Sequence, residues 1–229
     1  EIWNGATPFA AGTINAKAFK KWLSLLDEGK RLTTTTGSDT HNIYGDDYFG
    51  MTEWLDWLMD IVMKHPEIYP VQMNENVAYL TWLYKKVWPR LLSWVEQSNT
   101  PSTIHNYVYT NGKSQPQEIL QAIREGHSFI SNGPLITAEI NGVSYGDTAT
   151  LKDNTGKLSV HVFSKKPINH LWMYTGVDKK VEICTESVSL EGGFAYDIVT
   201  DEFDFGGASW ALFVADGGEN NLAISNPIL

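Results

Sequence analysis

The stretch TTTTGSDTHN, residues 33–42, places four consecutive threonines before a glycine and an Asp-x-His pair. Threonine is β-branched and favours extended backbone, and Gly37 can end a strand with a turn that residues carrying a Cβ disfavour. The stretch therefore predicts a strand that presents Asp39 and His41 at its C-terminal end. In barrels of alternating strands and helices, active sites lie at that end of the strands.

A helix and another strand are predicted just before this stretch. Residues 1–4 indicate a short strand, and residues 15–28 repeat apolar side chains on one face of a helix that Gly29 ends. A strand, a helix and a strand within about forty residues form a βαβ unit with parallel strands. The first part of the chain is therefore predicted to be α/β.

Further segments complete this predicted α/β part. Residues of about 50–100 carry helical spacing and indicate a helical insertion, and residues 104–109 indicate a strand. A helix is predicted in the next segment, SQPQEILQAIREG. Ser114 and Gln117 form its expected capping box, and Gly126 its expected end.

The sequence pattern changes near Pro134. From residue 135 onward, short runs rich in β-formers are separated by Gly, Asn and Asp turns every eight to twelve residues. This spacing predicts a small antiparallel β-sandwich. The expected domains are therefore 1–134, which is α/β, and 135–229, which is all-β.

Composition narrows the function. Seventeen Lys and Arg against 27 Asp and Glu give a net charge of −10, so no nucleic-acid partner is expected. No apolar run approaches the ~20 residues of a membrane-spanning helix, and the single cysteine, Cys184, excludes an internal disulfide. The chain begins at Glu1 in the middle of a predicted strand, so a lost preceding segment is expected. The compartment is not identified by the sequence, and the appended sandwich is the feature that favours an extracytoplasmic location.

Asp39 and His41 are candidate metal ligands. A carboxylate and a neutral imidazole two residues apart can bind one divalent ion or neighbouring ions, and they suit zinc, manganese or iron. The alternative for a Ser-Asp-x-His turn is a capped turn that carries a surface histidine.

The order of several motifs adds to this pair. They are EIWNG at Glu1–Gly5, WLSLLDEG at Trp22–Gly29, GSDTH at Gly37–His41, AIREG at Ala122–Gly126 and SNGP at Ser131–Pro134. The series resembles the C-terminal half of PHP-family metal-dependent hydrolases, named for polymerase and histidinol phosphatase, and the branch containing carbaryl hydrolase looks closest. The resemblance covers about residues 1–147, apart from the helical segment.

This resemblance implies a fold and an activity. PHP-family proteins are irregular (β/α) barrels that bind metals at the C-terminal ends of the strands and hydrolyse phosphate, carboxyl or carbamate-type esters with metal-activated water. For this chain it implies a partial barrel in residues 1–134, a small-molecule ester substrate, and Asp39 and His41 as metal ligands. The side chains it implies beside the metal or in the cleft are Ser38, Asn42, His105 and Asn4.

The chain departs from the family in its histidines. The family takes its first ligands from a His-x-His motif, whereas the six histidines here are singly placed. Two ligands are too few for a catalytic metal site, so the chain is expected to be inactive without a missing N-terminal half of the barrel. A barrel cut in this way leaves open strand edges, so the chain is expected to self-associate unless the helical segment covers them.

The rival hypothesis is a non-catalytic binding module, in which the barrel remnant is degenerate and the sandwich binds a carbohydrate or a protein. Trp172, Tyr174 and Trp210 are the aromatic residues that would form a carbohydrate platform, and packing in the strand core is the alternative for them. Whether the chain belongs to an enzyme is left open between the two hypotheses.

Overall fold

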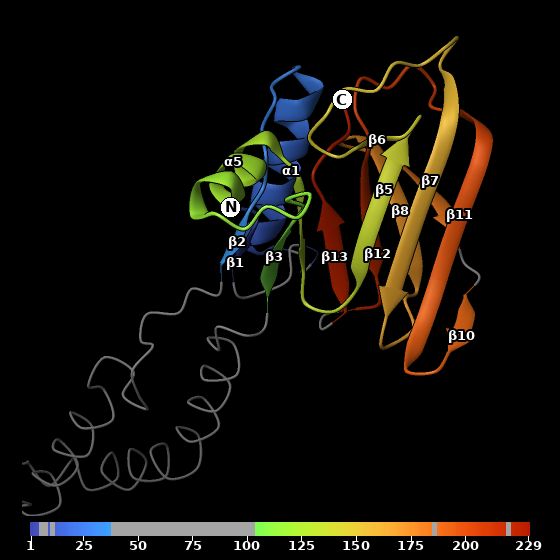
Figure 1. Ribbon diagram of the computed structural model, residues 1–229. Coiled ribbons are helices and arrows are strands. Elements are labelled where there is room, and N and C mark those ends of the chain that lie inside the picture. Colours follow the sequence, from blue (N-terminus) through green and yellow to red (C-terminus); the bar gives the residue numbers. More distant parts are fainter. Residues whose placement is uncertain (5–8, 10–11, 38–103, 185–186, 219–220) are drawn as a thin grey trace, which may run out of the picture. The chain divides into compact units, whose positions relative to one another are not determined.

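The computed structural model of the chain describes residues 1–4, 9, 12–37, 104–184, 187–218 and 221–229. These residues contain two helices and three β-sheets (Figure 1). One sheet is a parallel pair, and the strands of the other two are antiparallel throughout. The described part of the chain is therefore mainly β.

The predicted βαβ unit is confirmed. Strand β1 (Trp3–Asn4) and strand β2 (Thr36–Gly37) are parallel, and helix α1 (Ile14–Asp27) connects them. The helix begins at Thr13, whose hydroxyl accepts a hydrogen bond from the backbone N–H of Ala16 at 3.1 Å. The predicted strand in the threonine run is shorter than expected, because only its last threonine pairs with β1.

A six-stranded antiparallel sheet forms the middle layer. Its strands, in spatial order, are β3 (His105–Val108), β4 (Ser128–Ser131), β13 (Leu222–Ser225), β12 (Leu212–Asp216), β8 (His170–Gly176) and β9 (Lys179–Cys184). Strand β13 lies between β4 and β12, although it comes from the last part of the sequence. The sheet thus joins residues on both sides of Pro134.

A five-stranded antiparallel sheet packs on one face of this layer. Its strands, in spatial order, are β10 (Val188–Leu190), β11 (Gly193–Asp204), β7 (Thr155–Ser164), β5 (Leu135–Ile140) and β6 (Val143–Ser144). Burial alternates along β5, as a period of two predicts for a sheet with one face in the core. Ile136, Val160 and Met173 belong to the core that the two sheets share. The predicted sandwich strands are confirmed.

Helix α1 packs on the opposite face of the six-stranded sheet. Its apolar side chains share a second core with Leu212, Val214 and Ile224 from the centre of the sheet. Phe213 and Ala215, which alternate with them along β12, point into the first core. Strand β12 is therefore buried on both faces, which explains its nearly continuous apolar sequence.

The predicted partial (β/α) barrel is wrong. Helix α5 (Pro116–Glu125) connects β3 to β4, but these two strands are antiparallel, and β4 pairs on its other side with β13. A barrel needs each strand–helix–strand unit to add a parallel strand. Here α5 adds an antiparallel one, so the parallel order stops at β1 and β2 in the part of the chain that is described. The predicted helical insertion at about 50–100 lies outside that part.

The capping box of helix α5 lies one residue later in the sequence than predicted. The backbone N–H of Gln115 donates to Glu118 Oε2 at 3.3 Å, so the box uses Gln115 and Glu118 rather than the residues before each. Gly126 ends the helix as predicted, with φ of 85°. Neither helix in the described ranges is long and apolar enough to cross a bilayer.

Candidate functional site

The predicted metal ligands follow directly from the end of the parallel pair. Asn4 of β1 lies opposite Gly37 of β2, and both strands end there. Asp39 and His41 lie outside the described residues, as do Ser38 and Asn42. The structure therefore describes the strand ends before these four residues but not the residues themselves.

Side-chain hydrogen bonds hold the two strand ends in place. Asn106 of β3 accepts from the Thr36 N–H at 3.0 Å and donates to the Thr36 carbonyl at 2.9 Å. The Thr36 hydroxyl donates to the Trp3 carbonyl at 2.5 Å, and Asn15 Nδ2 donates to the Asn4 carbonyl at 2.8 Å. Asn106 was not predicted as part of this site, because its only sequence signal is an amide in the middle of a predicted strand.

Asn4 and His105 were both expected beside the proposed metal ions. Asn4 ends β1, and His105 begins β3, the strand whose Asn106 binds β2. Asn4 Oδ1 is buried and has no hydrogen-bond partner among the described residues. His105 is exposed and precedes Asn106, which binds β2. The Glu1 carboxylate lies so close to Gly37 that a Cβ there would overlap it. The structure thus places an unpaired acceptor and a carboxylate beside the end of β2.

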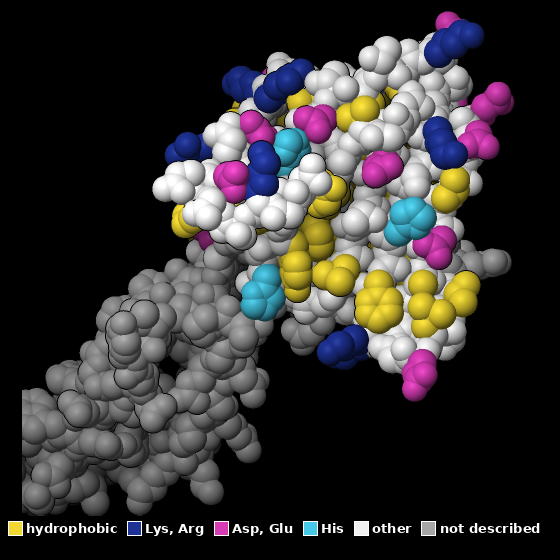
Figure 2. All heavy atoms as spheres, in the orientation of Figure 1, with side chains coloured by type: hydrophobic (Ala, Val, Ile, Leu, Met, Phe, Trp, Pro, Cys, Tyr) yellow, Lys and Arg dark blue, Asp and Glu magenta, His cyan; other side chains and the backbone are white. Residues whose placement is uncertain are grey.

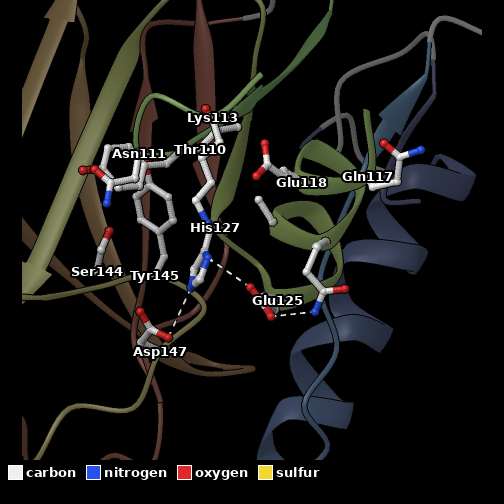
Figure 3. A pocket seen from close by; sticks show the side chains of 13 residues that line it. Thr110, Asn111, Lys113, Gln117, Glu118, Glu125, His127, Ser144, Tyr145 and Asp147 are labelled. Carbon is white, nitrogen blue, oxygen red and sulfur yellow. Dashed lines mark hydrogen bonds and ion pairs between the residues drawn. The ribbon is translucent and has the colours of Figure 1, made fainter. Parts of the chain in front are cut away.

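A second feature is a cleft between α5 and the loop that follows β6 (Figure 3). Its volume is about 480 Å³. Figure 3 shows the helix side chains on one wall and the loop side chains on the other, with His127 between them. The polar residues that line it are Thr110, Asn111, Lys113, Gln117, Glu118, Gln121, Glu125, His127, Ser144 and Asp147.

His127 links the two walls of the cleft. Its Nδ1 lies 3.6 Å from Glu125 Oε2, and its Nε2 lies 3.2 Å from Asp147 Oδ1. The contact with Asp147 is an ion pair when the ring is protonated. It is not a hydrogen bond, since the buried Nε2 has no hydrogen-bond partner among the described residues. Gln121 Nε2 donates to Glu125 Oε1 at 2.6 Å and fixes that carboxylate.

Two glycines let the walls approach each other. A Cβ at Gly146 would lie 2.5 Å from the Glu125 carbonyl oxygen and 2.6 Å from His127 Cδ2. A Cβ at Gly126 would lie 3.1 Å from Gly146 Cα. The loop is also tied to the end of the chain, since the Gly146 N–H donates to the Pro227 carbonyl at 2.8 Å. The base of the cleft is therefore formed by close contacts between the backbones of its two walls.

Two tyrosines give the cleft its aromatic surface. Tyr109 is 63% exposed. Tyr145 is buried, and its hydroxyl donates to the Ile136 carbonyl at 3.4 Å. Burial raises the pKa of Tyr145 to about 12, with a smaller contribution from Tyr109, so its hydroxyl stays protonated at neutral pH.

The cleft does not have the geometry of a metal site. Within the described ranges, no group of three or more His, Cys, Asp or Glu side chains is placed to hold a metal ion. The two nitrogens of His127 face different carboxylates, so the three side chains do not converge on one point. Amide, hydroxyl and carboxylate groups beside an exposed ring suit a polar organic ligand better.

The carbohydrate platform of the rival hypothesis is not assembled. Tyr174 and Trp210 are buried in the core beneath α1, which confirms the alternative of core packing for these two. Trp172 is only partly buried, with Lys180 Nζ 3.9 Å from its ring centre and the His170 ring stacked at 5.0 Å.

Comparison with known proteins found no matching family model, no matching curated protein and no matching solved structure.

Proposed function

We propose that this chain supplies Asp39 and His41 to a divalent-metal site that hydrolyses a small-molecule phosphate, carboxyl or carbamate-type ester. The observation that supports the proposal is the end of the parallel pair, where Asn4 lies opposite Gly37. The ligand pair follows Gly37 by two and four residues in the sequence. In strand-and-helix enzymes this end of parallel strands is the usual place for catalytic groups.

The donor set suits the proposed ion. A carboxylate and an imidazole are ligands for zinc, manganese or iron, and a bound ion of this kind lowers the pKa of a water molecule and polarises an ester. Asn4 Oδ1 is a buried acceptor without a partner among the described residues, and Asn15 holds the backbone of Asn4. Such an acceptor can receive a hydrogen bond from the ring N–H of a metal-bound histidine and so orient the imidazole.

Two ligands do not complete a catalytic site, which needs about three from the protein. The proposal therefore requires further ligands besides Asp39 and His41. Asp39 and His41 are expected to bind metal weakly without them. The chain is expected not to hydrolyse esters unaided.

Metal binding is the first test. The metal-free chain is titrated with manganese, and free manganese is followed by electron paramagnetic resonance. Asp39→Asn and His41→Ala are each expected to weaken binding at least tenfold. The matched control is the exposed His161–Asp197 pair, 2.7 Å apart on the sandwich, whose variants His161→Ala and Asp197→Asn are expected to leave binding unchanged.

Hydrolysis is the second test. Protein expressed with any residues encoded before Glu1 is assayed with bis-p-nitrophenyl phosphate and with naphthyl methylcarbamate. Turnover that Asp39→Asn abolishes supports the proposal. Manganese affinity equal in the wild-type chain and both ligand variants contradicts it, and so does a metal-loaded protein that cleaves neither ester.

The cleft of Figure 3 favours a second candidate, a carbohydrate-binding module. Amides, hydroxyls and carboxylates line it, and Tyr109 exposes a ring beside them, which is a combination that binds sugars. Calorimetry with a panel of soluble oligosaccharides tests this candidate. Tyr109→Ala is expected to abolish binding and Trp172→Ala to leave it unchanged, and an absence of binding across the panel rejects it.

A further inference from the structure

The outer face of the five-stranded sheet carries a row of exposed apolar side chains. Figure 2 shows apolar side chains gathered on this face, toward the lower right of the view. Five of the ten large hydrophobic residues that are exposed in the described ranges belong to strands of this sheet. They are Leu135 (44% exposed), Phe163 (39%), Val188 (60%), Leu190 (48%) and Val199 (57%).

Strand register aligns three of these residues, together with Ala195, at one level. Leu135 of β5 lies opposite Phe163 of β7, which lies opposite Ala195 of β11, which lies opposite Val188 of β10. Residues directly opposite each other in a sheet project from the same face. Neighbouring residues such as Val162 are buried in the core, so this row lies on the outer face.

Phe163 lies flat along the sheet. A Cβ at Gly193 would come within 2.9 Å of Phe163 Cζ, so the ring occupies the space that a side chain at 193 would need. The ring therefore leans from β7 over β11 and presents a face to solvent. A flat aromatic surface of this kind can pack against a second sheet.

We propose that this face binds a second copy of the chain, related by a two-fold axis that runs parallel to the strands between β7 and β11. Rotation about this axis keeps each residue at its own level and exchanges β7 with β11 and β5 with β10. Phe163 then faces Ala195 of the second copy, and Leu135 faces Val188. A large side chain meets a small one in the centre of the interface, as close packing requires.

The charges on the same face match under the same rotation. His161 and Asp197 lie opposite each other one level along the strands, so each faces the other residue type on the second copy. Lys165 follows the end of β7, and Glu191 follows the end of β10 at the same end of the sheet. The rotation brings Lys165 toward Glu191 of the second copy. Opposite charges then meet at the level of Lys165 and Glu191, and a histidine faces a carboxylate at the other level, which favours this occupant over an unrelated partner.

The size of the face indicates a weak dimer. With ~4.8 Å between strands and ~3.3 Å per residue, four strands offer a face about 15 Å wide, which is about 30 Å long on β7 and β11 but only about 10 Å long on the three-residue β10. This area is at most about 450 Å² per copy, which is below the ~800 Å² of a standard interface and in the class of weak, transient contacts. Association is therefore expected at high protein concentration and is independent of the proposed metal site.

Sedimentation velocity of the full chain, from micromolar to millimolar concentration, tests the inference. Phe163→Glu is expected to weaken association at least tenfold. Ile14→Glu, on exposed α1 surface, is the matched control and is expected to change nothing. Circular dichroism confirms that each variant is folded.

Charge exchange tests the orientation of the two copies. Lys165→Glu and Glu191→Lys are each expected to weaken the dimer, and the double variant to restore it at least threefold over either single one. A wild-type chain that stays monomeric at millimolar concentration overturns the inference. A dimer that Phe163→Glu does not affect, or a face that binds only a polysaccharide or another protein, also overturns it.

Discussion

Replacing Asn226 is expected to destabilise the fold more than replacing any other buried amide in the described part of the chain. Its side chain is fully buried and joins three separate parts of the sequence. Asn226 Oδ1 accepts from the Thr34 N–H at 2.7 Å, and Nδ2 donates to the Ser128 carbonyl and to the Ser128 hydroxyl, both at 2.9 Å. The threonine run is therefore held by a residue from near the C-terminus.

The magnitude follows from these bonds. Asn226→Ala leaves the buried Thr34 N–H without a partner, which costs about 1–3 kcal/mol, and removes two further bonds worth about 1 kcal/mol each. Ser128 keeps one partner, because its carbonyl also accepts from the Asn226 backbone N–H at 3.2 Å. The expected loss is about 3–5 kcal/mol of unfolding free energy, which corresponds to about 6–20 °C in Tm.

Urea unfolding, followed by tryptophan fluorescence and circular dichroism, measures the loss. Asn226→Asp is isosteric but cannot donate when ionised, so it is expected to be at least as destabilising at neutral pH and to recover as the pH falls and the carboxyl is protonated. The control, exposed Asn169→Ala, is expected to change stability by less than about 0.5 kcal/mol. A loss below about 1 kcal/mol for Asn226→Ala would refute the reasoning.

Three further outcomes are expected. Gly146→Ala is expected to cost at least about 2 kcal/mol more than Gly192→Ala in urea unfolding, because both have positive φ (93° and 89°) but only Gly146 lacks space for a Cβ. Thr13→Ala removes the cap of α1 and is expected to cost about 1 kcal/mol in the same assay, and Thr13→Ser to restore it. The pKa of Tyr145 is raised from 10.0 to about 12 in the folded chain. The part of the unfolding free energy that depends on this shift, about 2–3 kcal/mol, is complete below pH 10 and is lost as the pH rises through about 12. Tyr145→Phe is expected to flatten that loss. Absorbance at alkaline pH is expected to show one late-titrating tyrosine fewer in the variant, which keeps Tyr174, whose pKa burial also raises to about 12.

Local elements of this fold were predictable because their signals are local. The apolar face of α1 appears in its helical spacing, and Phe19 and Trp22 are buried as that spacing predicts. Strand β5 appears in its alternation, and its even-numbered residues are buried. Each of these patterns needs only the neighbours within one helix or strand.

The pairing of strands was not predictable in the same way. The helix between β3 and β4 indicated a parallel crossover, but β4 takes β13 as its second neighbour, and nothing in the sequence of either strand specifies that choice. Pairs between distant segments depend on the packing of whole layers. The barrel prediction failed for this reason.

The polar groups near the candidate site show the same division. Asn4 was expected beside the proposed metal site. It lies at the end of β1, and its Oδ1 has no hydrogen-bond partner among the described residues. Asn106 and Asn226 were not expected, because each bonds to backbone in the threonine run from far away in sequence. Such bonds cannot be predicted from the sequence, because the sequence around an amide in a strand or a turn does not identify the distant group that it binds.

The central position of β13 affects how the chain folds during synthesis. Strands β4 and β12 both need β13 as a neighbour, and it is made after nearly all other strands. The ribosome must therefore release residues 222–225 before the middle layer can close. Until then the apolar surfaces of α1 and of the earlier strands lack their final cover, so contacts between segments distant in sequence are expected to limit the folding rate.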